Sequence, residues 1–178
     1  LNGVPFPENF LVDGKKEFKR DADRSAADWD FLKKLRDIWT GNLVIKGVTH
    51  SEDALRIKKI GCDAIWVSNH GGRQLDGAPS SISMLSEIVR VAGKSTSVWV
   101  DGGIRSGQDI LKAIALGAKG TLLGRAYLYG LGALGEAGVT KCLEIIQNEL
   151  EISMALCGHT DINTVTRDII SSKTFYLD

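Results

Sequence analysis

The sequence predicts an α/β protein with a parallel sheet covered by helices, and three observations support this prediction. Four short apolar runs alternate with segments of helical period from residue 41 onward. The runs contain no alternating polar residues, which is typical of strands that are buried on both faces. Glycines separate the segments at the positions where strand-to-helix turns are expected. The four runs are Leu43–Val48, Ala64–Ser68, Ser97–Val100 and Gly120–Gly124.

Helix start and stop signals lie between these runs. Thr49–Glu52 and Ser106–Asp109 read as capping boxes that begin two helices, and Gly61 ends the first of these helices. A third helix is expected to stop at Gly93, and a longer one near the chain end stops at Gly158. The longer helix is expected to carry Val139, Leu143, Ile146 and Leu150 at helical spacing.

The first 28 residues differ from the rest of the chain. They hold two of the three prolines and a charged stretch over 13–21, and they show no sustained period. We therefore predict a mobile loop or linker over 1–28 and a folded domain over 29–178. Ser25–Asp28 reads as a capping box for a helix that carries Trp29 and Trp39.

Composition excludes several classes of protein. Twenty-two basic residues balance 22 acidic ones, so a nucleic-acid partner, which needs a cationic face, is not expected. No apolar run approaches the roughly 20 residues of a bilayer span, and the start of the chain has no signal-peptide pattern. Cys62, Cys142 and Cys157 lack metal spacing and lie in apolar patterns, which favours reduced, buried thiols and no metal site. We expect a cytoplasmic protein, with peripheral contact with a membrane left open.

The last two strands both run into glycine followed by arginine. Asp101–Arg105 follows the third run, and Gly124–Arg125 closes the fourth. Glycines let backbone N–H groups approach an anion, and arginine adds a bidentate charged contact. Two such loops on consecutive strands match the phosphate site that many (β/α)8 barrels build after strands 7 and 8. Either loop alone could equally be a tight turn with a solvated arginine.

This assignment also predicts the extent of the fold. If the last two strands are the seventh and eighth, the first two are the fifth and sixth. A complete barrel typically has about 250 residues, whereas this chain has 178. The sequence therefore predicts the C-terminal half of a (β/α)8 barrel, with four parallel βα units and C-terminal helices. Because the chain does not start with Met, we expect the natural protein to begin upstream.

Two further features predict chemistry at the strand ends. The second strand runs into His70-Gly71-Gly72-Arg73. This places an imidazole suited to proton transfer near a planar guanidinium suited to bind a carboxylate. A polar turn with Arg73 paired to Asp76 is the structural alternative. Lys46 lies in an otherwise apolar strand, where a charge needs a partner or a cavity, unless it reaches solvent at the strand end. Trp66 and Trp99, by contrast, read as core or helix-facing packing in the strand interiors.

Taken together, these segments resemble the FMN-dependent 2-hydroxy-acid dehydrogenases and oxidases, which include L-lactate dehydrogenase, L-lactate oxidase, glycolate oxidase and mandelate dehydrogenase. The resemblance runs from about Trp29 to about Ile170 without a large gap, and the run Ser68–Asp76 is its most specific part. It is carried by Ile45–Gly47, Ser68–Asp76, Asp101–Arg105 and Leu123–Arg125.

The resemblance implies a role for each site residue. His70 would be the base that accepts a proton from the substrate, and Arg73 would bind the substrate carboxylate. Lys46 would stabilise reduced, anionic FMN, and Ser68 would contact the flavin. The ribityl and phosphate groups would be held by Asp101, Gly102, Gly103, Ile104, Arg105, Gly124 and Arg125.

The same resemblance implies partners and raises two alternatives. The substrate would be a small (S)-2-hydroxy acid, the electron acceptor a quinone, a cytochrome or oxygen, and the assembly a homo-oligomer. Complete members of the family also use an N-terminal half with a substrate-binding tyrosine and an aspartate that orients the histidine, and neither can be placed here. One alternative is therefore a non-catalytic half-barrel that binds FMN or phosphate and pairs with another half. The other is a different FMN or phosphate-ester barrel, such as an isomerase.

Overall fold

The computed structural model describes residues 11–12, 15–16 and 27–171. The chain divides into two compact units, Leu1–Leu35 and Arg36–Asp178. In the first unit, β1 (Leu11–Val12) pairs antiparallel with β2 (Lys15–Lys16). The sequence predicts a linker over residues 1–28. Apart from the two strands and residues 27 and 28, these residues lie outside the described ones, so the boundary at residue 28 stays a prediction.

An aspartate, Asp28, directly precedes helix α1 (Trp29–Ile38). The Oδ1 atom of Asp28 accepts a hydrogen bond from the backbone N–H of Phe31 at 2.8 Å, which satisfies one of the free donors of the first turn. Ser25, the cap expected from the sequence, lies outside the described residues.

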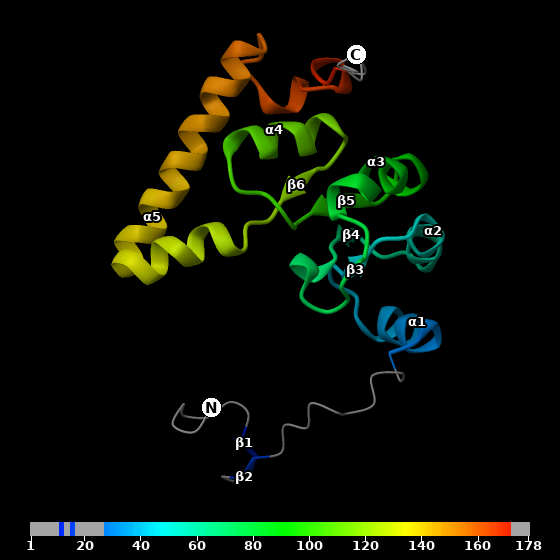
Figure 1. Cartoon of the computed structure of the whole chain (residues 1–178). Coiled ribbons are helices and arrows are strands. Elements are labelled where there is room, and N and C mark those ends of the chain that lie inside the picture. The colour runs from blue at the N-terminus through cyan, green and yellow to red at the C-terminus, as the bar shows by residue number, and fades with distance from the viewer. Residues whose placement is uncertain (1–10, 13–14, 17–26, 172–178) are drawn as a thin grey trace. The chain divides into compact units, whose positions relative to one another are not determined.

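The second unit is built on a four-stranded parallel sheet (Figure 1). Its strands follow one another in the order of the chain, as the sequence predicts. The last strand is shorter than expected, because residues 122–124 turn away toward the final long helix. The strands are β3 (Val44–Val48), β4 (Ala64–Val67), β5 (Ser97–Val100) and β6 (Gly120–Thr121).

Three helices connect the strands: α2 (Ser51–Ile60), α3 (Ser81–Ala92) and α4 (Gly107–Ala115). The capping box that begins α4 is confirmed in full. The capping box predicted for α2 is wrong, because the N-cap is His50, whose Nδ1 accepts from the backbone of Glu52 at 3.3 Å. The imidazole nitrogen takes the part expected of the Thr49 hydroxyl.

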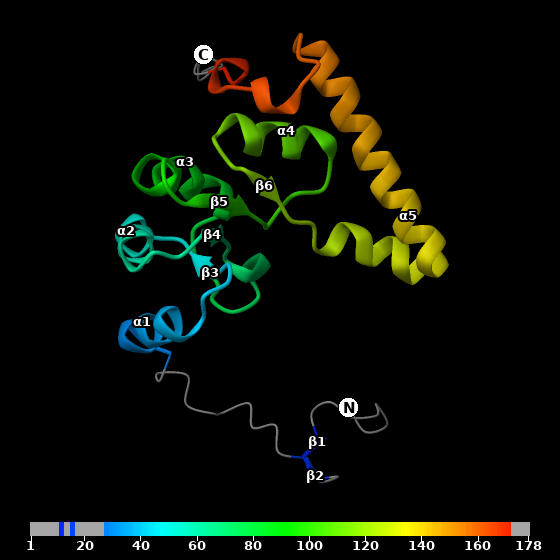
Figure 2. The same ribbon diagram turned by 180° about the vertical axis from the view of Figure 1, so that it is seen from behind.

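One face of the sheet forms the core with these helices. Ile65, Val67, Val98 and Val100 are at most 1% exposed. Helices α2 and α3 contribute Ile57, Leu85 and Ile88, which are equally buried. Figures 1 and 2 show α2 and α3 side by side along the same side of the sheet.

The opposite face of the sheet carries a row of large side chains. Lys46 pairs in register with Trp66, and Trp66 pairs with Trp99. Side chains alternate between the two faces of a strand, so this row points away from the helix-covered core. Because β3 is an edge strand here, it exposes Lys46 and Gly47. The prediction that this strand is buried on both faces is therefore wrong.

Three residues separate the last strand from the long helix α5 (Arg125–Leu156), which begins earlier than the sequence predicts. Non-helical dihedral angles at Leu134 and Gly135 bend it, and the backbones of Gly130 and Gly138 touch beside the bend. A Cβ atom on Gly138 would meet the Gly130 carbonyl, so neither position has room for a side chain.

The apolar residues that the sequence places on this helix differ in burial. Ile146 is 5% exposed, but Leu143 is 46% exposed. Leu150 packs against the cluster of Leu111, Ala115 and Val165, which joins α5 to α4 and to the C-terminal turns. Among the described helices, none is long and apolar enough to cross a membrane.

The cysteines differ in burial, which corrects one expectation from the sequence. Cys62 is buried and Cys142 half-buried, but Cys157 is exposed. Cys157 caps the C-terminus of α5, where the chain turns outward after its last helical residue. The apolar pattern around Cys157 therefore did not indicate a buried thiol.

Candidate active site

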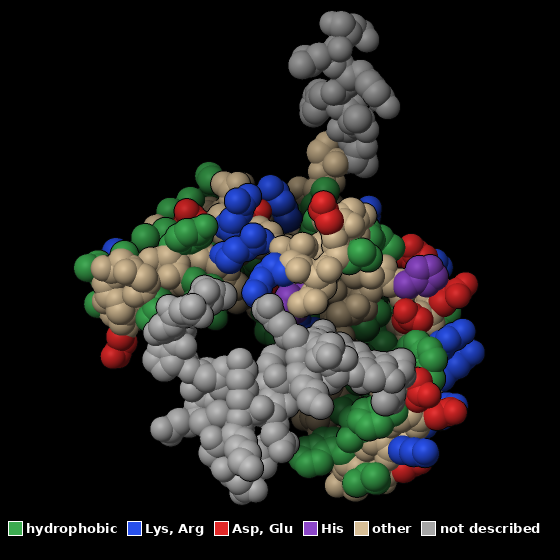
Figure 3. All heavy atoms as spheres, turned by 60° about the horizontal axis from the view of Figure 1, so that its bottom comes forward, with side chains coloured by type: hydrophobic (Ala, Val, Ile, Leu, Met, Phe, Trp, Pro, Cys, Tyr) green, Lys and Arg blue, Asp and Glu red, His purple; other side chains and the backbone are tan. Residues whose placement is uncertain are grey.

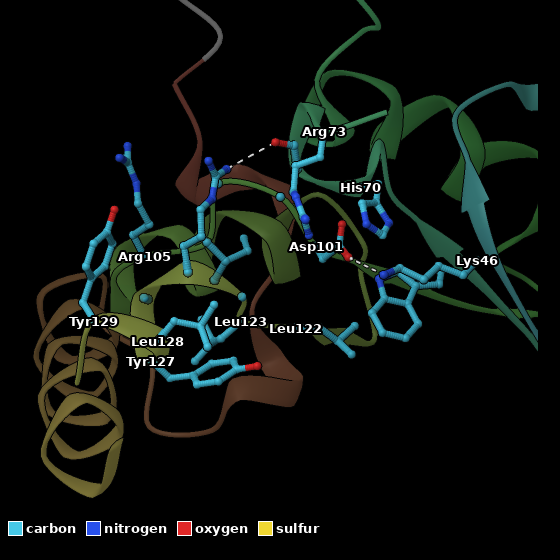
Figure 4. A pocket seen from close by; sticks show the side chains of 18 residues that line it. Lys46, His70, Arg73, Asp101, Arg105, Leu122, Leu123, Tyr127, Leu128 and Tyr129 are labelled. Atoms are coloured by element: carbon cyan, nitrogen blue, oxygen red, sulfur yellow. Dashed lines mark hydrogen bonds and ion pairs between the residues drawn. The ribbon is translucent and has the colours of Figure 1, made fainter. Parts of the chain in front are cut away.

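A cavity of about 670 Å³ opens where the parallel strands end (Figure 4). It brings together every predicted site residue except Ser68. Arg105 and Tyr129 lie at one end of the cavity and Lys46 at the other, with His70 and Arg73 beside the Lys46 end. The predicted residues that line it are Lys46, His70, Arg73, Asp101, Gly102, Gly103, Ile104, Arg105, Gly124 and Arg125.

Lys46 has two partners on the inner face of the sheet. Its Nζ atom lies 3.4 Å from Oδ2 of Asp101 and 4.4 Å from the centroid of the Trp66 ring. A carboxylate and an aromatic face both attract an ammonium group. The charge in this strand therefore faces a cavity and is paired, which is one of the two outcomes expected from the sequence. The side chain remains 42% exposed.

Ser68 supports the histidine loop instead of lining the cavity. It is 2% exposed, and its Oγ accepts a hydrogen bond from the backbone N–H of His70 at 3.1 Å. The neighbouring Asn69 donates its own N–H to Oγ of Ser81, also at 3.1 Å. Ser81 is a buried residue at the start of α3 that the sequence analysis did not single out. A Cβ atom on Gly102 would lie 3.0 Å from the same hydroxyl, so this hydroxyl separates two loops of the site.

His70 and Arg73 are both exposed at the mouth of the cavity. The backbone of His70 has a φ of 57°, in the left-handed region. No described residue forms a hydrogen bond with its imidazole ring. No salt bridge joins Arg73 to Asp76, both of which are described, so the simple polar-turn alternative lacks its ion pair. Both side chains are accessible to a ligand.

The two glycine–arginine loops present backbone and charge to the cavity. Gly102 and Gly103 have φ values of 84° and 83°, and a Cβ atom on Gly103 or Gly124 would meet nothing within 4 Å. The Oδ1 atom of Asp101 is buried and has no hydrogen-bond partner. A loop with open backbone beside an unpartnered acceptor is suited to bind a polar ligand. Figure 3 shows Lys and Arg side chains gathered around a histidine on this face.

The prediction that Trp66 packs in the core or against a helix is wrong. Trp66 lines the cavity together with residues 122, 123 and 126–129 of the segment that leads into α5. Its indole Nε1 is buried without a hydrogen-bond partner. Strand alternation could have found it, because Trp66 lies between two buried core residues, Ile65 and Val67, and so must point to the other face.

Comparisons with known proteins agree with this arrangement. The chain is 49% identical over 145 residues to an L-lactate dehydrogenase of Caulobacter vibrioides, covering 82% of this chain and 38% of that protein. It is 42% identical over 160 residues to a peroxisomal (S)-2-hydroxyacid oxidase of Arabidopsis thaliana, covering 90% of this chain and 44% of the oxidase. The chain thus spans less than half the length of these relatives.

Solved structures show the same fold. A soluble mutant of the membrane-associated (S)-mandelate dehydrogenase from Pseudomonas putida superposes with a TM-score of 0.81 at 39% identity, over 94% of this chain and 47% of the other. A monotopic membrane (S)-mandelate dehydrogenase superposes with a TM-score of 0.80 at 42% identity, over 84% and 39%. These likenesses confirm the half-barrel prediction. The sequence model of the FMN-dependent dehydrogenases matches residues 7–172. The chain therefore belongs to the FMN-dependent dehydrogenase family.

Proposed function

We propose that this chain carries the proton acceptor, the carboxylate site and the flavin-phosphate site of an enzyme that oxidises an (S)-2-hydroxy acid to the 2-oxo acid. It would act within an eight-stranded barrel that joins it to four further βα units, called here the complete barrel. One observation carries the proposal. A base and four cationic side chains line one cavity at the ends of four parallel strands; they are His70, Lys46, Arg73, Arg105 and Arg125.

The cavity fits FMN in its charge and in its backbone. Arg105 and Arg125 supply two cations, and the open glycines let backbone N–H groups reach phosphate oxygens. The unpartnered Oδ1 of Asp101 can accept a hydrogen bond from a ribityl hydroxyl. Lys46 lies at the other end of the cavity, where the flavin ring would extend. Bound FMN would supply a two-electron acceptor.

The side chains of the chain would perform the remaining steps. Arg73 would fix the substrate carboxylate with its planar fork and align the α carbon. His70 would take one proton from the substrate, and the second proton and two electrons would leave with the flavin, which balances the oxidation of an alcohol to a ketone. The ammonium of Lys46 would stabilise the negative charge on the reduced ring.

The names of the relatives support the substrate class. They include an L-lactate dehydrogenase and an (S)-2-hydroxyacid oxidase, and (S)-mandelate dehydrogenases share the fold. We propose a lactate-, glycolate- or mandelate-like substrate, with a quinone, a cytochrome or oxygen as the electron acceptor. One of the mandelate dehydrogenases is described as a monotopic membrane protein, which supports peripheral contact of a cytoplasmic enzyme with a membrane.

The alternative is that the chain by itself binds FMN or phosphate without catalysis. The observation that favours it is the unpartnered imidazole of His70, since no described side chain orients the ring or sets its tautomer. Both proposals keep the phosphate site, and they differ only in whether substrate is turned over.

Anaerobic absorbance spectroscopy separates the two proposals. The chain alone and the complete barrel are each mixed with FMN, freed of excess flavin, and then given L-lactate, glycolate or (S)-mandelate. We expect the complete barrel to retain yellow, bound FMN that one of these acids bleaches. A barrel that keeps its flavin but is bleached by none of the three acids would support the binding fragment. A barrel that retains no flavin would contradict both proposals.

A further inference from the structure

The backbone of His70 requires support from its surroundings. Its φ of 57° makes it the one described non-glycine residue with a positive φ. Only a few per cent of non-glycine residues adopt this region, Asn, Asp and His more often than the others, and neighbouring contacts hold a residue there. The contacts that hold His70 therefore determine where its imidazole can lie.

Contacts from the strand side fix the start of the loop. Ser68 accepts the N–H of His70, and the buried Ser81 hydroxyl accepts the N–H of Asn69, both at 3.1 Å. Asn69 also accepts the N–H of Gly72 through Oδ1 at 3.2 Å. These bonds hold residues 68–70 against β4 and α3, and the carbonyls of Asn69 and His70 accept the N–H groups of Gly72 and Arg73 within the loop.

A contact from another part of the cavity lining reaches the carbonyl of Gly71. Nη2 of Arg125, the first residue of α5, donates to the carbonyl oxygen of Gly71 at 3.4 Å, and Figure 4 draws this bond with a dashed line. A Cβ atom on Gly71 would lie only 3.5 Å from the same nitrogen. The arginine of the phosphate loop therefore contacts the residue that directly follows the base.

We propose that Arg125 is a positioning residue that couples anion binding at the Gly124–Arg125 loop to the position of His70. A guanidinium has five N–H donors in a rigid plane, so it can bind phosphate oxygens and keep its bond to the Gly71 carbonyl. An anion that fixes the guanidinium thereby fixes the loop. The inference rests on the proposed function, because that function places the phosphate at this loop.

Hydrogen exchange of the flavin-free complete barrel tests the coupling, with inorganic phosphate as the probe. We expect saturating phosphate to slow amide exchange in a peptide covering residues 69–77 by about two- to tenfold, the range that one hydrogen bond contributes. A peptide from α2, such as 51–60, serves as the internal control and should not change. A role for Arg125 in folding alone would give no phosphate dependence.

Two variants make the test specific. Arg125→Lys keeps a charge for phosphate but lacks the planar fork, so phosphate should bind while the protection of 69–77 is lost. Arg105→Ala removes another cation of the cavity, so it should raise the phosphate concentration needed but reach the parent's protection at saturation. Calorimetry measures phosphate binding in parallel.

The outcomes separate this inference from the proposed function. Phosphate that binds without protecting 69–77, or that protects Arg125→Lys as fully as the parent, would overturn the coupling and leave the phosphate site intact. A parent protein that binds no phosphate would overturn the proposed phosphate site and the coupling with it.

Discussion

The Nζ atom of Lys46 lies 3.4 Å from Oδ2 of Asp101, so an ion pair connects the ends of β3 and β5 across the ring of Trp66. The two side chains are 42% and 16% exposed. A pair of this exposure contributes at most about 1 kcal/mol to folding. Its importance therefore lies in where it holds the ammonium group, at the end of the cavity proposed for the flavin ring.

Replacement of Lys46 tests that placement. In the complete barrel, Lys46→Met should make the reduction potential of bound FMN more negative, because the reduced ring loses a nearby cation. Lys46→Arg should retain most of the parent potential, since it keeps the charge. Spectroelectrochemical titration measures all three proteins. Equal potentials for Lys46→Met and the parent would place the lysine away from the flavin.

The isolated chain should associate. It exposes the free edges of β3 and β6 and an inner face that includes Trp66 and Trp99. Unpaired edges and apolar patches favour contact between copies. Sedimentation velocity should show dimers or larger species, whereas the complete barrel should sediment with its edges covered. A compact monomer of the isolated chain that unfolds cooperatively would argue against the half-barrel account.

Acid should weaken the contacts that Asp63 makes in the second unit. Asp63 accepts the N–H of Leu43 at 2.8 Å and pairs with Arg36 at 3.0 Å. The hydrogen bond from Leu43 is the main cause that lowers the pKa of Asp63 below its ordinary value, and Arg36 lowers this pKa further. A lowered pKa means that the stabilisation is complete above the unfolded pKa, near 3.9, and is lost as the pH falls through the folded value.

Urea unfolding of the complete barrel checks this pH dependence. Asp63→Asn should lower the urea midpoint at pH 7, and the difference from the parent should shrink as the pH falls below about 4. Asp37→Asn, at an exposed position of α1, is the matched control and should change little. A difference between Asp63→Asn and the parent that does not vary with pH would show that the carboxylate charge is not involved.

The three cysteines should react at different rates. Cys157 is exposed and should be alkylated first by iodoacetamide. Burial raises the pKa of the Cys62 thiol, which leaves less reactive thiolate, so Cys62 should react only after unfolding. Peptide mass mapping over time gives the order. Early labelling of Cys62 would contradict the burial of its side chain.

The sequence predicted the sheet well because its signals are local. Buried strands of β-branched and apolar residues lie between helices whose caps can be read directly, as for Ser106 and Gly61. The predictions were wrong where tertiary contacts determine the exposure of a strand or the bend of a helix. Lys46 was assigned to a buried strand, but its strand is an edge in this chain, and the bend of α5 at Gly135 depends on close contact between two glycine backbones.

The site was predictable where residue type limits the chemistry, and less so elsewhere. Gly102 and Arg125 face the cavity because glycine–arginine loops follow parallel strands, whose ends meet at one edge of the sheet. Ser68 is buried and does not line this cavity, and its hydroxyl accepts the N–H of His70, so its contact with the flavin stays a prediction. The contribution of Ser81 could not be foreseen, since it arises from a contact across 12 residues of chain.

The proposed contact between Arg73 and the substrate carboxylate leads to a separate prediction. In the complete barrel, Arg73→Ala should raise KM steeply, because the substrate carboxylate loses a charged, bidentate partner. It should also lower kcat, since this contact aligns the α carbon with the flavin. Arg73→Lys should recover only part of both losses. Steady-state kinetics with the best substrate measures KM and kcat. An unchanged KM in Arg73→Ala would show that Arg73 does not bind the substrate carboxylate.

The central claim is that His70 takes the substrate proton, and stopped-flow reduction of bound FMN tests it most directly. The oxidised flavin band of the complete barrel is followed anaerobically against substrate concentration for the parent, His70→Gln and the control His50→Asn, which keeps a helix cap outside the cavity. We predict that His70→Gln binds FMN and substrate but reduces its flavin about 10²–10⁴-fold more slowly, the usual effect of a positioned base. His50→Asn should match the parent. Flavin reduction at the parent rate in His70→Gln would contradict the account.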